Sequence, residues 1–157
     1  MMALTIDAFC DLKGALLGLD LGVKTIGVAV TDPGQTLATP VTTIKRIKFG
    51  KDADALIALA DERGIVGLVL GLPLNMDGSD GPKVQSVKTF AKNLSRKTDL
   101  PIALWDERLS TAAAERALID LDVSRSRRAA VIDSHAASYI LEGAVDRLAK
   151  LRRGASA

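Results

Sequence analysis

The sequence has few aromatic residues, one cysteine and no long apolar run, and each shortage excludes a class of protein. Aromatic residues make up only 3% of the 157 residues, so a binding surface built on stacked bases is not expected. Cys10 is the single cysteine, which excludes an internal disulfide and gives no sign of an oxidising compartment. No apolar run approaches the ~20 residues of a membrane helix, and the first residues lack the basic start and apolar stretch of a signal peptide. We therefore expect a cytoplasmic protein.

The formal net charge is also small, at +2, and by itself does not indicate an acidic partner. Basic residues nevertheless cluster at Lys45–Lys51, Arg125–Arg128 and Lys150–Arg153. With 48% hydrophobic and 25% charged residues the composition is that of a globular protein, and the length fits a single domain. We predict an N-terminal extension over residues 1–15, the domain over 16–150 and a basic C-terminal tail over 151–157.

The segment Leu16–Asp32 is the one around which the rest of the chain is organised. It predicts two buried strands, Leu16–Asp20 and Thr25–Thr31, joined by a tight turn through Gly22. Asp20 ends the first strand, which is otherwise apolar. Because a carboxylate there is costly to desolvate unless something binds it, we interpret Asp20 as a metal ligand.

The remaining elements predict an α/β domain with a five-stranded mixed sheet and helices on both faces. Pro40 cannot donate to a ladder, so its strand should lie at a sheet edge. The expected elements are a strand over Leu37–Ile47, a helix over Asp52–Arg63, a strand over Ile65–Leu72, a helix over Ser79–Lys97, a strand over Pro101–Trp105, a helix from Ser110 or Thr111 to Leu121, a polar connection over Asp122–Arg128 and a long helix from there to Leu148.

Asp133 is the least expected residue of the last helix. An apolar face that must meet the sheet recurs there at helical spacing, formed by Ala129, Ala130, Ala136, Ala137, Ile140 and Leu141. Asp133 lies in the middle of this face, although Asp is a poor helix-interior residue. A hydrogen bond to the backbone or to an Arg is one explanation, and a ligand role is the other.

Asp20 and Glu107 each follow a strand of the same predicted direction, and ligands of such sheets gather at the carboxyl ends of the strands. A helix packed across that end adds Asp133. Three carboxylates without a nearby His or Cys favour Mg²⁺ or Mn²⁺, as one ion or two, and such sites suit phosphoryl chemistry. The alternative for Glu107 is a surface acid paired with Arg108.

Several basic and polar residues are candidates for contacts with nucleic-acid phosphates, in structured RNA or branched DNA. Lys24 lies in the turn after Asp20 and is one candidate. The basic segment Ser124–Arg128 is another, and the alternative to a phosphate contact there is a solvated surface loop. The other candidates are Asn75, Arg108, Arg127 and Arg128. His135 lies about 200° around the helix from Asp133, so we expect it to face solvent or a partner. Trp105 should be a core residue, and Asp106 should point away from Glu107.

Four motifs in order, LLGLDLGVKTIGVAVTD, GLPLNMDGS, WDERLST and DSHAASYIL, resemble the YqgF/RuvX family of Holliday-junction-resolvase-like proteins, described as pre-16S rRNA nucleases. The resemblance extends from Leu16 to about Leu148. It implies a ribonuclease-H-like fold and catalytic acids at Asp20, Glu107 and Asp133. It also implies processing of the 5′ end of a ribosomal RNA precursor. In the related RuvC-type resolvases the second acid follows the fourth strand, where this sequence has Gly71-Leu72-Pro73.

Three other functions are compatible with parts of the sequence. A Holliday-junction resolvase would act on branched DNA, as a monomer or as a homodimer matched to a two-fold junction. A non-catalytic nucleic-acid-binding module would not need the three acids. A nucleotide-binding protein of the actin and sugar-kinase type shares the Asp-x-Gly turn, but it needs two lobes and a second phosphate loop, for which 157 residues are too few.

Overall fold

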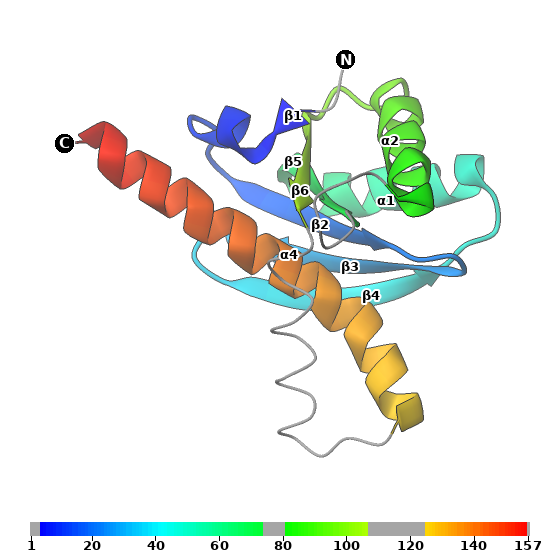
Figure 1. Ribbon diagram of the computed structural model, residues 1–157. Coiled ribbons are helices and arrows are strands. Elements are labelled where there is room, and N and C mark those ends of the chain that lie inside the picture. Colours follow the sequence, from blue (N-terminus) through cyan, green and yellow to red (C-terminus); the bar gives the residue numbers. More distant parts are fainter. Residues whose placement is uncertain (1–3, 74–80, 107–124, 157) are drawn as a thin grey trace.

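The protein is built on a twisted mixed sheet with helices on both faces (Figure 1). The computed structural model describes residues 4–73, 81–106 and 125–156, with only the backbone of 125–134 and 155–156. Within these residues the sheet has six strands in the order β1-β6-β5-β2-β3-β4. They are β1 (Leu4–Thr5), β2 (Ala15–Leu21), β3 (Thr25–Thr31), β4 (Ala38–Lys45), β5 (Ile65–Leu72) and β6 (Ile102–Asp106).

Strands β1, β6, β5 and β2 are parallel, whereas β3 is antiparallel to both of its neighbours. The carboxyl ends of β2, β5 and β6 therefore lie at one edge of the sheet. Strand β4 is an edge strand, as Pro40 predicted, and a register shift beside Pro40 accommodates the missing donor. This arrangement places the end of β2, where Asp20 lies, in the interior of the sheet order rather than at a margin.

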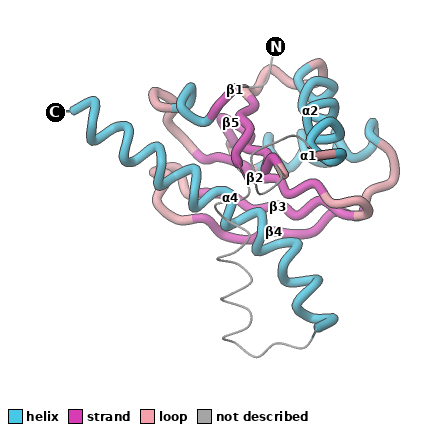
Figure 2. The backbone as a smooth tube through the Cα atoms, in the orientation of Figure 1, coloured by secondary structure: helices cyan, strands magenta, loops and turns pink. Residues whose placement is uncertain are grey.

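Helices α1 (Phe49–Glu62) and α2 (Pro82–Ser95) cover one face of the sheet, and α4 (Arg125–Ser156) crosses the other (Figures 1 and 2). The alternation of side chains along β2 divides the core in two. Leu17 and Leu19 pack with α1 and α2, while Leu16 packs with α4. Both faces of the sheet at β2 are shielded from solvent, because Leu16, Leu17 and Leu19 are all fully buried.

The bounds of two predicted strands, Thr25–Thr31 and Ile65–Leu72, are confirmed without change, and the others are correct in type with shifted ends. Helix α1 begins at Phe49, before the predicted start. Helix α2 begins at Pro82, because proline favours the first position of a helix, and not at Ser79. The helix predicted to end at Leu121 lies outside the described residues.

Helix α4 is longer than predicted at both ends. Residues 125–128, which we expected to form a polar connection, are its first turn, and it continues through the residues assigned to the tail as far as Ser156. Although this helix has 32 residues, none of the described helices is long and apolar enough to cross a membrane.

The sixth strand, β1, lies in the N-terminal extension and corrects the prediction of five strands. It pairs with β6 and continues into a short 3-10 helix, η1 (Ile6–Phe9). Ile6 and Phe9 are buried beneath α4. A strand of two residues is too short to show a period in the sequence, which is why it was missed. The division of the chain into extension, domain and tail stays a prediction.

Candidate active site

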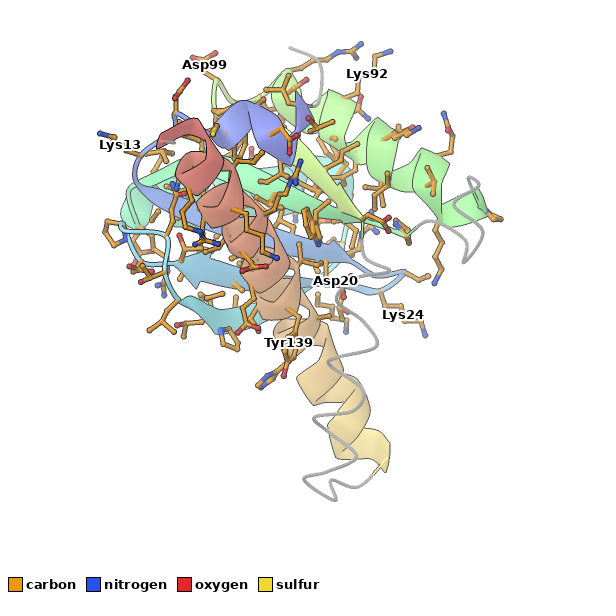
Figure 3. All side chains as sticks on the ribbon, turned by 60° about the vertical axis from the view of Figure 1, so that its left-hand side comes forward. Lys13, Asp20, Lys24, Lys92, Asp99 and Tyr139 are labelled. Atoms are coloured by element: carbon orange, nitrogen blue, oxygen red, sulfur yellow. The ribbon has the colours of Figure 1, made fainter. Side chains whose placement is uncertain are left out.

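Asp20 lies at the carboxyl end of β2 and is half-buried. It follows Leu16 and Gly18 in the alternation of the strand, so it faces the side of the sheet on which α4 lies. Figure 3 shows Asp20 beside α4, with Lys24 at the tip of the β2–β3 turn. The predicted ligand of the first strand is therefore directed at the helix that carries Asp133.

Helix α4 lies unusually close to β2 at Gly18. A Cβ atom at Gly18 would be 2.5 Å from Cγ of Leu141 and 3.0 Å from the carbonyl oxygen of Ala137. Only a residue without a side chain permits this approach. Leu141 and Ala137 are themselves fully buried, so the helix has no room to shift outward without opening the core.

The direction of α4 over β2 follows from its C-terminal half. Arg152 donates hydrogen bonds to the carbonyl oxygens of Phe9, Cys10 and Leu12, which precede β2, at 2.9 to 3.2 Å. The helix then passes Gly18 at Ala137, and its N-terminal residues extend past the other end of the strand (Figure 1). Helix and strand thus run in opposite directions, and the first half of α4 lies toward the end of β2 that bears Asp20.

Trp105 connects the end of β6 to the same helix. A Cβ atom at Gly143 would be 2.8 Å from the indole ring, so the indole lies against α4. Trp105 is half-buried and packs against the core beneath this helix, which agrees in part with the prediction of a core residue. Trp105 is in register with Gly71 of β5, and Leu72 is in register with Asp106. Three neighbouring strands therefore end at one level, close to α4.

The three predicted acids are described to different extents. Asp20 is described in full, Asp133 only as backbone of α4, and Glu107 lies immediately beyond the described part of β6. Within the described ranges, no three His, Cys, Asp or Glu side chains lie close enough to hold a metal ion. The convergence of the three acids stays a prediction.

The predicted nucleic-acid contacts divide in the same way. Lys24 is exposed, and its carbonyl oxygen accepts the backbone N–H of Arg46 at 2.8 Å. Arg127 and Arg128 belong to the first turn of α4, where only the backbone is described, and Asn75 and Arg108 lie outside the described residues. His135 is half-buried, with its ring 6.5 Å from that of Tyr139 on the same helix.

Two carboxyl groups of the described residues, both outside the predicted site, have shifted pKa values. The backbone N–H groups of Leu37 and Thr36 lower the pKa of Asp32 from 3.8 to about 2, with help from the Thr36 hydroxyl. Asp32 lies in the β3–β4 turn, at the end of the sheet opposite Asp20. Burial raises the pKa of Glu142 on α4, and its electrostatic interaction with His135 opposes this shift. Asp32 is a turn residue, and its role is structural.

A pocket that the sequence did not predict lies at the carboxyl end of β2, on the face away from α4. It has a volume of about 420 Å³ and is lined by Leu21, Gly22, Val23, Arg46, Ile47, Lys48, Phe49, Asp52, Lys83, Ser86 and Val87. The basic cluster Lys45–Lys51 was the available signal, but no sequence pattern indicated that it lies beside α2. The first residue of its lining, Leu21, directly follows Asp20.

Comparison with known proteins agrees with this geometry. A family model described as RuvX, Holliday junction resolvase, matches residues 14–147. The chain belongs to the RuvX family. The resemblance drawn from the four motifs is thereby confirmed.

Curated relatives of this RuvX chain carry the name "Putative pre-16S rRNA nuclease". A protein from Bradyrhizobium sp. strain BTAi1 is 67% identical over 141 residues, which cover 90% of this chain and 88% of the relative. A protein from Rhodopseudomonas palustris strain TIE-1 is 68% identical over the same length with the same coverage. The nuclease assignment of the family thus rests on relatives that match along almost the entire chain.

Solved structures confirm the ribonuclease-H-like fold class of the RuvX chain. RuvC from Thermus thermophilus superposes with a TM-score of 0.51 at 11% identity, covering 89% of this chain and 96% of RuvC. T. thermophilus RuvC in complex with a Holliday junction substrate gives a TM-score of 0.52, also at 11% identity, and covers 86% and 96%. At this identity the likeness establishes the fold alone.

Proposed function

We propose that this RuvX protein is a divalent-metal-dependent endonuclease that processes the 5′ end of pre-16S rRNA in the cytoplasm, with Asp20, Glu107 and Asp133 as its catalytic acids. The observation that carries the proposal is the close crossing of α4 and β2 at Gly18, next to a half-buried Asp20 that faces the helix. The substrate is taken from the names of relatives that are 67 and 68% identical.

The register of helix against strand supports Asp133 as the partner of Asp20. From Gly18 to Asp20 the strand advances by about 6.6 Å. From Ala137, which lies on Gly18, four residues back along α4 cover about 6.0 Å, just over one turn, and lead to Asp133. Because helix and strand run in opposite directions, both steps go the same way. The two acids are thus expected on facing surfaces at the same level of the sheet.

The alternation of β6 supports Glu107 as the third acid. Trp105 packs against α4, and residues two apart in a strand lie on one face. The pattern therefore predicts Glu107 on the α4 side, across β5 from Asp20, whereas Asp106 falls on the other side. Gly71 of β5, in register with Trp105, has no side chain to fill the space between Asp20 and the expected position of Glu107.

This donor set fits Mg²⁺ or Mn²⁺, because three carboxylates supply hard oxygen ligands. When bound, one or two such ions would activate water and stabilise the leaving oxygen of a phosphodiester. The chain's own task is to orient the acids and to neutralise the flanking phosphates. For the latter we propose Lys24 and the predicted contacts Asn75, Arg108, Arg127 and Arg128.

The test is cleavage of labelled precursor rRNA by wild type and by Asp20→Asn, with Mg²⁺, with Mn²⁺ and with a chelator. Asp20→Asn removes a ligand charge at constant volume, and we expect at least about a hundredfold loss of activity, since even residues that only orient metal ligands cost 10- to 100-fold. The matched control is Asp61→Asn, an exposed residue of α1 remote from this edge. Equal activity of both variants would contradict the site, and activity in chelator would contradict the metal.

A measurement that needs no substrate uses Trp105, the only tryptophan in the chain. It lies two residues before Glu107 and against α4, so Mn²⁺ bound by the three acids should quench its fluorescence. We expect a saturable change in wild type and a weakened one in Asp20→Asn. An identical titration of the two proteins would show that Asp20 holds no ion.

Cleavage of branched DNA is the second candidate, favoured by the description of the matching family model as Holliday junction resolvase. A four-way junction is therefore included as a parallel substrate. If the protein cuts the junction but not the precursor, the substrate is branched DNA and not the rRNA precursor. Binding of either substrate without cleavage in any metal would leave a non-catalytic binding module.

A further inference from the structure

A basic groove runs along the α1–α2 side of the sheet and begins beside the end of β2. Two adjoining pockets of about 420 and 410 Å³ form it and share Arg46, Phe49 and Ser86. The basic groove is defined here by Arg46, Lys48, Phe49, Lys83, Ser86 and Asn93. None of these residues belongs to the site proposed above, which faces α4 on the other side of the sheet.

Arg46 is held in place at the centre of the basic groove. One guanidinium nitrogen donates to the carbonyl oxygen of Gly22 at 2.7 Å, and the guanidinium carbon lies 5.7 Å from the centre of the Phe90 ring. Phe90 is buried and packs edge-on against Phe49. A guanidinium has five N–H donors, and within the described part of the chain Gly22 engages one nitrogen only. The remaining donors form a preorganised fork suited to a phosphate.

The charges around Arg46 have one sign at the surface. Lys48 and Lys83 are exposed, and within the described ranges neither forms an ion pair. Among the described residues that line the groove the one acid is Asp52, which is 3% exposed and accepts the backbone N–H of Ile47 at 3.1 Å. Asp52 is thereby turned inward, in the first turn of α1, where the helix dipole favours an acid. The described part of the groove therefore presents exposed cations to a ligand, whereas its carboxylate is buried.

The position of the basic groove relates it to the catalytic edge. Leu21 and Gly22 line it and directly follow Asp20, so it begins about 3.3 Å further along β2. Two apolar residues at its mouth, Val23 and Ile47, are 79 and 72% exposed. They offer apolar contact to a sugar or an unstacked base in a protein with few aromatics. Pockets of about 400 Å³ are the size of small-molecule sites and suit single nucleotide units rather than a double helix.

We propose that the basic groove binds the phosphodiester backbone of an unpaired strand that flanks the cleavage site. Arg46 engages one phosphate, and Lys48 and Lys83 neutralise its neighbours. The proposal rests on the nuclease function proposed above, because it takes the strand that passes Asp20 to continue over the edge of the sheet. It assigns single-stranded flanks to the α1–α2 side and the scissile bond to the α4 side.

The test compares two double variants with the same change of charge. Lys48→Gln/Lys83→Gln removes the two exposed cations of the groove, and Lys51→Gln/Lys92→Gln removes two exposed cations of α1 and α2 outside it (Lys92 is labelled in Figure 3). Binding of a single-stranded RNA oligonucleotide is measured in chelator between 50 and 200 mM salt. A blunt duplex of equal length is the second ligand.

For the single strand, the slope of log affinity against log salt should fall by about 1.4 in the groove variant, at about 0.7 per lost phosphate contact. The affinity ratio of wild type to groove variant should then shrink about sevenfold across this salt range. The control variant should keep the wild-type slope. Equal slopes for the two variants would overturn the proposal, and so would an equal loss of duplex binding. If wild type cleaves precursor rRNA but the variants do not differ, this proposal fails alone; if wild type does not cleave, the nuclease function fails.

Discussion

Gly18→Ala tests the contact that we consider decisive for the site. The added Cβ would lie 2.5 Å from Cγ and 2.9 Å from Cδ1 of Leu141, a fully buried residue, and 3.0 Å from a backbone oxygen. Neither the strand nor the helix has free space, so the overlap must be relieved by displacing α4 or by forcing Leu141 off its rotamer. Overpacking of this kind costs about 1–3 kcal/mol. For a chain of this length that is a fall of about 2 to 12 °C in Tm.

The matched control is Gly50→Ala in the first turn of α1, where a Cβ would meet nothing within 4 Å. Alanine there removes backbone entropy from the unfolded chain and should be neutral or stabilising by up to about 1 kcal/mol. Both variants are compared by urea unfolding and by thermal scans. If Gly18→Ala proves as stable as Gly50→Ala, α4 does not lie on β2 as described.

A double variant separates overpacking from a general loss of stability. Leu141→Ala alone leaves a cavity and should cost about 2–5 kcal/mol. With Gly18→Ala added, the new methyl group occupies part of that cavity. The double variant should therefore lose about 1 kcal/mol less stability than the sum of the losses in the two single variants. Strict additivity would refute the steric argument. Nuclease activity should fall more in Gly18→Ala than in Gly50→Ala, because a shift of α4 moves the turn that carries Asp133 away from Asp20.

Three further predictions concern the turn at Asp32, the docking of η1 and the indole of Trp105. Because the pKa of Asp32 is lowered from 3.8 to about 2, its contribution to stability is present above about pH 4 and is lost as the pH falls through 2. Asp32→Asn, which keeps an acceptor oxygen but cannot titrate, should therefore lose less Tm than wild type between pH 5 and pH 2; parallel curves would exclude this role. Arg152→Ala removes three hydrogen bonds to carbonyl oxygens before β2 and should raise amide exchange in residues 4–12 more than in β5, whereas uniform exchange would show that η1 does not depend on it. Gly143→Ala should displace the indole of Trp105, which lies 2.8 Å from the new Cβ, and shift its fluorescence maximum; an unchanged spectrum would contradict that contact.

Strands β2, β3 and β5 were predictable because each is a short, largely apolar run that is closed by turn residues. Ile65–Leu72 is an example: it is buried on both faces, and its glycine and proline neighbours mark both ends. Helix ends were less predictable, since they depend on tertiary contacts. The first turn of α4 has the composition of a solvated connection, and its helical state follows from its continuity with a face buried on the sheet. The strand β1 depends entirely on pairing with β6 and has no local signal.

Two features of the site were predictable from the sequence. The acid at the end of β2 interrupts an apolar strand, and the apolar face of α4 follows the helical period. The sequence could not predict the basic groove, whose parts come from a β-turn, a strand end and two helices. Arg46 illustrates the reason. Its charge is visible in the sequence, but its fixed orientation results from a carbonyl oxygen 24 residues earlier and an aromatic ring on α2.

Two glycines explain how one helix can serve both the fold and the site. Gly18 allows α4 to lie on β2 at Ala137. Gly143, nearly two turns after Ala137 on α4, allows the indole of Trp105 from β6 to pack against the helix. The helix is thus fixed against two strands separated by β5, and Arg152 fixes its far end to the residues before β2. Three such contacts determine the position and direction of a rigid rod, and they leave its first half no freedom except rotation about its own axis. That rotation is resisted by Ala137 and Leu141, which are fully buried. We therefore expect packing alone to hold an acid placed one turn before Ala137 at the level of Asp20, which is the preorganisation that the proposed carboxylate metal site requires.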